Sequence, residues 1–229
     1  MIDFHFWPTP NGYKVALFFE ESGLAYTVKP VDIGKGGQFA PEYLAISPSG
    51  KMPAIVDRDP PDGGVPLSVF ESGAILLYLA GKTGKFIPRD PRARMQAIEW
   101  LFWQMAGLGP MTGQHGHFSV YAPEPIAYAI DRYRREAHRL LGVLDNRLQS
   151  RDFIAGDEYT IADMACYPWI DPYRKAPLDL APYQNVRRWR EAIARRPATQ
   201  RACAMGKRYE SDAPMSGEQR RILFGHAPG

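Results

Sequence analysis

Residues 47–56 read SPSGKMPAIV, a turn-rich segment that runs through Met52-Pro53 into an apolar strand. A cis bond before proline turns the backbone sharply, and this junction is a candidate for that geometry. The N–H and C=O groups of Met52 would then point out of the sheet edge and could pair with a peptide-like ligand. An ordinary trans proline in a loop is the alternative that this stretch alone leaves open.

The residues that follow predict a hairpin and then a helix. Ala54–Val56 and Leu67–Phe70 flank the turn-rich sequence DPPDGG, which is typical of paired strands. Glu71 and Ser72 then open the helical sequence AILLYLAGK. A serine at a helix N-terminus can hold a carboxylate, and Glu71 offers an acceptor for an ammonium. Together they would suit the head of an amino acid, although Ser72 as a plain helix cap is the alternative.

A second polar turn lies near the N-terminus. Residues 2–6 alternate apolar and polar side chains, which predicts a strand, and FWPTPNGYKV (6–15) runs from it into a helical pattern. A polar turn at a strand–helix junction is a frequent ligand position. Yet Thr9-Pro-Asn-Gly contains no cysteine, serine or histidine, so it supplies no nucleophile. A plain turn with Asn11 as the helix cap is the alternative.

The chain divides into two halves with different patterns. The first half has the order β-α-β, a connector, then β-β-α, and FIPRDPR (86–92) forms a linker with two prolines. From Pro91 onward the pattern is helical, with one long amphipathic helix between Ile126 and Leu148. TIAD (160–163) has the capping-box pattern and predicts the start of a buried helix. The tail after Gly206 is predicted to form a strap over the surface.

Composition narrows the class of protein. The 229 residues are 45% hydrophobic and 23% charged, as in ordinary globular proteins, and the net charge of +3 comes from scattered basic residues. We therefore predict no nucleic-acid partner, and no apolar run is long enough to cross a membrane. Cys166 and Cys203 are far apart and form no CxxC motif, which favours a reducing cytoplasm. His115 and His117 alone are insufficient for a metal site, so no metal is predicted.

These patterns together resemble the glutathione transferases, in which a thioredoxin-like domain precedes a helical domain. KMPAIV, FESGAILLYLA and the TIAD box are the main markers, and the resemblance extends to about residue 208. TPNGYKV, VDIGKGGQF, WLFWQMAGLGPM and YAIDRYRRE resemble the nu class, which includes bacterial disulfide-bond oxidoreductases. The resemblance implies an α/β plus all-α fold. It consists of a thioredoxin-like domain (β-α-β-α-β-β-α, residues 1–85), an all-helical domain (91–208) and a tail (209–229).

The resemblance also implies which residues do the chemistry. Glutathione brings its own thiol, and Thr9 and Asn11 would be the catalytic residues that donate hydrogen bonds to its sulfur. Donors favour the charged form and so lower the pKa of a thiol. The N-terminus of the helix that starts near Gly12 would add positive potential to the same effect.

The remaining contacts with glutathione are assigned in the same way. The Met52 backbone would pair with the cysteinyl unit beside cis-Pro53, while Glu71 and Ser72 would take the γ-glutamyl ammonium and carboxylate. Gln38 and Lys51 would reach the glycyl end, with solvated loop residues as the alternative. Arg132 would pair with a carboxylate of a second glutathione, whereas its neighbours Arg134, Arg135 and Arg139 would be surface residues.

The activity implied is glutathione-dependent disulfide-bond reduction, with weak transferase and peroxidase activity. Where other classes place a Tyr, Ser or Cys, this chain has Trp7 to Pro10, which weakens the case for efficient conjugation of electrophiles. Conjugation and a regulatory binding role remain the alternatives. The resemblance further implies a homodimer in the cytoplasm, with glutathione as co-substrate and no metal.

Overall fold

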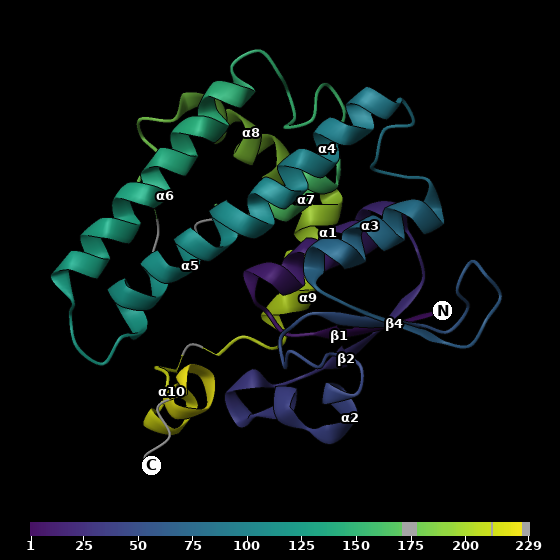
Figure 1. Ribbon diagram of the computed structural model, residues 1–229, viewed down its shortest axis with the longest axis horizontal. Helices are drawn as coiled ribbons and strands as arrows, with labels where there is room; N and C mark the ends of the chain where they lie inside the picture. The colour runs from purple at the N-terminus through teal and green to yellow at the C-terminus, as the bar shows by residue number, and fades with distance from the viewer. Residues whose placement is uncertain (171–177, 212, 226–229) are drawn as a thin grey trace. The chain divides into compact units, whose positions relative to one another are not determined.

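The computed structural model describes residues 1–170, 178–211 and 213–225 (Figure 1). The chain forms two compact units. One contains Met1–Thr83 together with Arg201–Gly229, and the other contains Gly84–Gln200.

The first unit is built on a four-stranded sheet with the order β2-β1-β3-β4. Its strands are β1 (Ile2–Phe6), β2 (Tyr26–Pro30), β3 (Ala54–Asp57) and β4 (Leu67–Phe70). β1 pairs in parallel with β2 and antiparallel with β3, and β3 pairs antiparallel with β4. The predicted first strand is confirmed, and its alternation buries Ile2, Phe4 and Phe6. The antiparallel pairing of β3 with β4 confirms the predicted hairpin.

Helices cover both faces of this sheet. α1 (Pro10–Ser22) and α3 (Ser72–Thr83) pack together on one face, and α2 (Pro41–Leu44) lies on the other (Figure 1). Two short 3-10 turns, η1 (Ile33–Lys35) and η2 (Gly37–Phe39), lead into α2. The predicted order β-α-β-α-β-β-α is therefore confirmed.

The chain returns to the first unit within α9 (Pro197–Lys207). Arg201 Nε lies 2.7 Å from Glu20 Oε2 on α1. A Cβ atom on Gly206 would lie 2.0 Å from the Tyr13 hydroxyl oxygen, so only glycine allows this close approach. This contact holds the end of α9 against the start of α1.

The described part of the tail contains a helix, α10 (Gly217–Phe224). Ser216 and Gln219 make a capping box at its start. α10 packs against η1, and Ile222 approaches Gly36. α10 is therefore part of the first unit.

The second unit is helical, as predicted. Its α-helices are α4 (Pro91–Trp103), α5 (Gly109–Gly116), α6 (Ala127–Leu148), α7 (Ile161–Cys166) and α8 (Gln184–Ala194). Single π turns, η3 (Gln104–Leu108) and η4 (His117–Tyr121), extend α4 and α5, and a 3-10 turn, η5 (Tyr167–Trp169), follows α7. The long amphipathic helix is α6, which buries Ala137, Leu140 and Leu144.

The predicted capping box at the start of α7 is confirmed. Thr160 caps the helix, and the buried Asp163 carboxylate accepts hydrogen bonds from the Thr160 and Ile154 backbone N–H groups, each at 2.9 Å. It also accepts one from Trp189 Nε1 on α8 at 2.8 Å. Burial raises the pKa of Asp163 to about 6, although these hydrogen bonds favour the charged form.

Across the described ranges, no helix combines the length and apolar character needed to span a membrane.

Asp57, the last residue of β3, is a buried acid that links this strand to α3. Asp57 Oδ2 accepts hydrogen bonds from the Tyr78 hydroxyl and from Lys82 Nζ, both at 2.6 Å. Burial by itself would raise the pKa of Asp57, but the hydrogen bonds from Lys82, Tyr78 and the Asp59 backbone outweigh it and lower the pKa. This cluster fixes the direction in which α3 crosses the sheet.

The folded pKa of Asp57 lies below its unfolded value of about 3.9. The stability it contributes is therefore fully present above about pH 4 and is lost as the pH falls through the folded pKa. We expect Asp57→Asn to lower the free energy of unfolding at pH 7 by about 3 kcal/mol, because it leaves the mostly buried Lys82 without its carboxylate. Urea titrations at neutral and acidic pH measure both effects.

The matched control is Asp3→Asn, whose partner Arg58 has a side chain that is 57% exposed. An exposed pair contributes about 1 kcal/mol or less. Equal losses of stability for the two variants would contradict the role assigned to Asp57.

Candidate functional site

Strand register brings three polar segments to one edge of the sheet. Ala54, the first residue of β3, pairs with His5 on one side and with Phe70 on the other. The end of β1, the start of β3 and the end of β4 therefore lie side by side. The turn after β1, the segment before β3 and the residues after β4 are the three segments that the sequence singled out.

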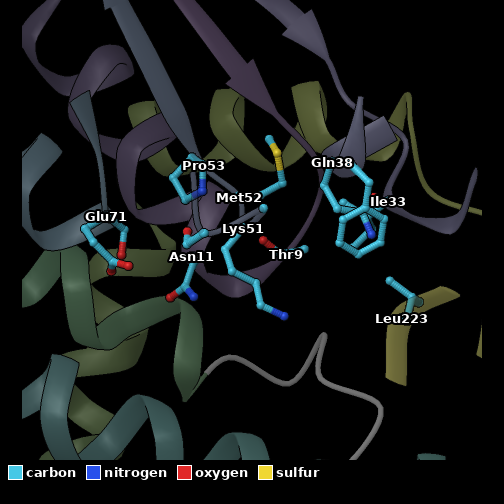
Figure 2. Close-up of a pocket in the computed structure, with 13 residues that line it drawn as sticks. Thr9, Asn11, Ile33, Gln38, Lys51, Met52, Pro53, Glu71 and Leu223 are labelled. Carbon is cyan, nitrogen blue, oxygen red and sulfur yellow. The ribbon is translucent and has the colours of Figure 1, made fainter. Parts of the chain in front are cut away.

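A cavity of about 280 Å³ lies at this edge of the first unit. Its volume is close to the lower end of the range typical of small-molecule sites, about 300–1,000 Å³. Eight of the nine residues predicted to contact glutathione line it: Thr9, Asn11, Gln38, Lys51, Met52, Pro53, Glu71 and Ser72. In Figure 2, Glu71 and Asn11 lie towards one end of the cavity, and Gln38 lies towards the other.

Thr9 and Asn11 are held by the start of α1. The helix begins at Pro10, two residues earlier than predicted, because proline presets the backbone angle of a first helical residue. Thr9, and not Asn11, is the N-cap, and its Oγ1 accepts a hydrogen bond of 3.1 Å from the Gly12 N–H. This bond uses an oxygen lone pair and is compatible with the hydroxyl donating to a ligand.

The electrostatics of this helix end favour an anion. The N–H groups of the first turn carry the positive end of the helix dipole, and the first turn of α1 contains no acidic residue. The Asn11 side chain lies in this turn and lines the cavity. A sulfur anion placed here would meet a hydroxyl, an amide and the helix end.

The Met52-Pro53 bond is cis, as predicted. The residue before it is held by two side chains, because the Lys51 carbonyl accepts hydrogen bonds from the Tyr43 hydroxyl at 2.7 Å and from Ser47 Oγ at 3.0 Å. Burial raises the pKa of Tyr43 to about 12, so its hydroxyl stays protonated as a donor. No sequence motif pointed to these two supporting residues.

Glu71 has a strained backbone. Its φ of 68° lies in the left-handed region, which costs a residue other than glycine about 1–3 kcal/mol. Such strain persists where the surrounding structure imposes it, often at functional sites. Next to it, Ser72 is the first residue of α3, is buried, and accepts a hydrogen bond of 3.2 Å from Lys14 Nζ.

Gln38 lies at the other end of the cavity with an unsatisfied group. It is 4% exposed, and its Oε1 has no hydrogen-bond partner among the described residues. A buried acceptor without a partner costs about 1–3 kcal/mol. This burial, together with its place in the cavity lining, argues against the alternative of a solvated loop residue.

The rest of the lining was not predicted from the sequence. Ser49 and Gly50 belong to the quoted stretch before β3, and Ile33 and Phe39 belong to the loop that contains Gln38. Leu223 comes from α10, and no sequence pattern connected the tail with the site (Figure 2). In Figure 2, Ile33 and Leu223 lie on the side of the cavity where Gln38 lies.

Arg132 belongs to the helical unit. It lies on α6 with a side chain that is 52% exposed, and its guanidinium is 3.9 Å from Glu136. Arg134 and Arg135 pair with Asp131, which fits their assignment as surface residues. The role of Arg132 stays a prediction.

Neither cysteine lines the cavity. Cys166 is buried in α7, and Cys203 lies on α9. In the part of the chain that the structure describes, no three His, Cys, Asp or Glu side chains gather as metal ligands would.

This sheet, its cis-proline and its cavity at two helix N-termini define a thioredoxin-like domain, here followed by a helical unit. The family model for the glutathione S-transferase N-terminal domain matches residues 1–81, and the model for the C-terminal domain matches residues 105–197. The chain is 55% identical over 202 residues to the disulfide-bond oxidoreductase YfcG of Escherichia coli, covering 88% of this chain and 94% of that protein. The chain belongs to the glutathione S-transferase family.

Two solved structures extend this comparison. A glutathione transferase from Burkholderia graminis, with two glutathione molecules bound per subunit, has a TM-score of 0.87 and 43% identity. That match covers 90% of this chain and 89% of the other. A glutathione transferase from Pseudomonas putida, with one glutathione disulfide per subunit, has a TM-score of 0.80 and 40% identity, over 88% and 90% of the two chains.

Gly12 sets how closely α1 approaches β1. A Cβ atom there would lie 2.4 Å from the Trp7 carbonyl oxygen, which belongs to the backbone and cannot swing away. We expect Gly12→Ala to lower the unfolding temperature by about 4–8 °C, as for a loss of about 2 kcal/mol in a chain of this size. Thermal unfolding followed by circular dichroism measures this.

Gly81→Ala is the matched control, because a Cβ atom on Gly81 of α3 would meet nothing within 4 Å. Alanine favours a helix over glycine by about 1 kcal/mol, so this variant should be as stable as the parent or more so. A Gly12→Ala protein as stable as Gly81→Ala would contradict the argument.

Proposed function

We propose that this protein is a glutathione-dependent disulfide-bond oxidoreductase that uses glutathione as co-substrate and no cysteine of its own. The observation that carries the proposal is the cavity at the start of α1. Thr9 and Asn11 line it, whereas neither cysteine does. The identity with the disulfide-bond oxidoreductase YfcG supports the same activity.

The proposed role of Thr9 and Asn11 is to stabilise the glutathione thiolate. A thiol is a much weaker nucleophile than its thiolate. The usual thiol pKa of about 8.5 leaves little thiolate at pH 7. A hydroxyl donor, an amide donor and the positive end of α1 all favour the charged form and so lower this pKa. Neither side chain competes with the sulfur as a nucleophile.

The other lining residues would hold the tripeptide in register with that sulfur. We assign the γ-glutamyl ammonium to Glu71 and the γ-glutamyl carboxylate to Ser72, at one end of the cavity. The Met52 backbone beside cis-Pro53 would pair with the cysteinyl unit. Gln38 and Lys51 would reach the glycyl end, where Lys51 would pair with the glycyl carboxylate.

Reduction then takes two exchange steps. The glutathione thiolate attacks one sulfur of the substrate disulfide, which forms a mixed disulfide and releases the other sulfur as a thiolate. A second glutathione thiolate attacks the glutathione sulfur of the mixed disulfide, giving glutathione disulfide and the second substrate thiolate. The protein orients the sulfurs and stabilises their charge. Arg132 would pair with a carboxylate of the second glutathione.

The same activated thiolate can attack other electrophiles. We therefore assign the protein weak transferase and peroxidase activity as secondary reactions. We expect a higher rate with a model disulfide than with an aryl halide, and measuring both rates tests this. Faster conjugation than reduction would make conjugation the main activity.

We further propose that the protein is a nu-class homodimer of the cytoplasm. β4 is an edge strand whose residues Leu67 and Phe70 are exposed apolar side chains, with Val65 just before it. Such an edge is commonly covered by a partner. The two cysteines are far apart in the sequence and form no CxxC motif, and this supports a reducing compartment together with the need for reduced glutathione. A monomer by light scattering at micromolar concentration would contradict the dimer.

The first experiment is the reduction of hydroxyethyl disulfide by glutathione, coupled to glutathione reductase. We expect Asn11→Ala and Thr9→Ala each to lower kcat/KM by about tenfold or more, because each removes a donor to the developing thiolate. The loss should shrink at high pH, where the thiolate forms without help. Full activity in both variants would contradict the assignment, and no glutathione binding by the parent would overturn the proposed function.

Arg132→Ala belongs in the same assay, with Arg134→Ala as its matched control on the same helix. We expect the first to raise the KM for glutathione by about tenfold, as for loss of a charge-assisted pair. The second should change nothing. Equal effects of the two substitutions would remove Arg132 from the site.

A further inference from the structure

Lys14 is a buried lysine next to one end of the cavity. It lies on α1, is 1% exposed, and donates a hydrogen bond of 3.2 Å from Nζ to Ser72 Oγ. It is not part of the cavity lining, so it would act on a ligand through Ser72 and through its charge. Lysine is almost never buried to this extent, because removing an ammonium from water is costly.

In this hydrogen bond Lys14 is the donor and the Ser72 hydroxyl oxygen is the acceptor. An ammonium has donors and no acceptor, so the Ser72 oxygen accepts and uses a lone pair. The bond is therefore compatible with the hydroxyl proton pointing at a ligand. Hydrogen bonds polarise one another in a chain, and a hydroxyl that accepts from a cation is a stronger donor.

Two further features favour a carboxylate beside Ser72. Ser72 is the first residue of α3, so the N–H groups at the positive end of that helix lie beside it. The Lys14 charge is shielded from water, and buried charges are screened less by solvent and salt. Glu71 supplies the opposite charge to the same end of the cavity.

We propose that Lys14 is a positioning residue that makes this end of the cavity a carboxylate subsite. The inference rests on the proposed function, in which Ser72 takes the α-carboxylate of the γ-glutamyl group. Lys14 orients the Ser72 hydroxyl and supplies a positive charge behind it. With Glu71 on the ammonium, the subsite selects an amino-acid head over a simple amine.

The test compares two ligands by isothermal titration calorimetry. One is glutathione, and the other is 4-aminobutyryl-cysteinyl-glycine, the same tripeptide without the α-carboxylate. Lys14→Met keeps an unbranched apolar side chain and removes the charge. We expect it to weaken glutathione binding by about tenfold or more, equal to about 1.4 kcal/mol, and to leave binding of the analogue within about twofold.

Control substitutions distinguish the loss of the Lys14 charge from a general loss of folded structure. Lys29→Met removes an exposed lysine of β2 and should change neither affinity. Lys14→Gln keeps a donor to Ser72 without the charge, and it should also weaken glutathione selectively. Thermal unfolding establishes that each variant is folded before binding is measured.

Equal weakening of both ligands by Lys14→Met would give Lys14 a purely structural role and overturn the inference. So would full glutathione affinity in Lys14→Gln. If neither variant folds, the two affinities of the parent protein provide the test. Equal affinity for glutathione and the analogue would show that the carboxylate is not recognised and would overturn the inference. A parent that binds neither ligand would overturn the proposed function itself, which distinguishes the two failures.

Discussion

The pairing of Ala54 with both His5 and Phe70 is the constraint on which the site depends. It fixes the direction of three strands, so that β1 and β4 end where β3 begins. Chain segments far apart in sequence then meet at one sheet edge. Each contributes a different kind of group: the N-terminus of α1, the backbone around a cis-proline, and the N-terminus of α3 with Glu71 before it.

Two helix N-termini at one cavity explain why the site needs few charged side chains. Each helix presents N–H groups and a partial positive charge at no cost in side-chain ordering. The N-terminus of α1 suits a sulfur anion beside Thr9 and Asn11, and the N-terminus of α3 suits a carboxylate beside Ser72. The sheet keeps the two at a fixed separation, since Asp57 joins β3 to α3 through Tyr78 and Lys82.

The supporting residues are buried and polar. Tyr43 and Ser47 hold the Lys51 carbonyl, and Lys14 contacts Ser72. None of these three side chains is part of the cavity lining. They fix the position of groups that do line it, which is how a small cavity can keep a peptide-like ligand in one register. The strained backbone of Glu71 fits the same pattern, because packing around it must hold φ at 68°.

Local sequence determined many of the helices and strands. Alternation in residues 2–6, the turn DPPDGG, the TIAD box and the period of α6 each depend on neighbours in the chain, so they can be read without the fold. The resemblance to a family then pointed to Thr9, Asn11, Gln38, Lys51, Met52, Pro53, Glu71 and Ser72. Only the tertiary structure brought Lys14 against Ser72 and Leu223 of α10 into the cavity wall. Those contacts join residues far apart in the chain, and no local pattern records which distant side chain will fill a given space.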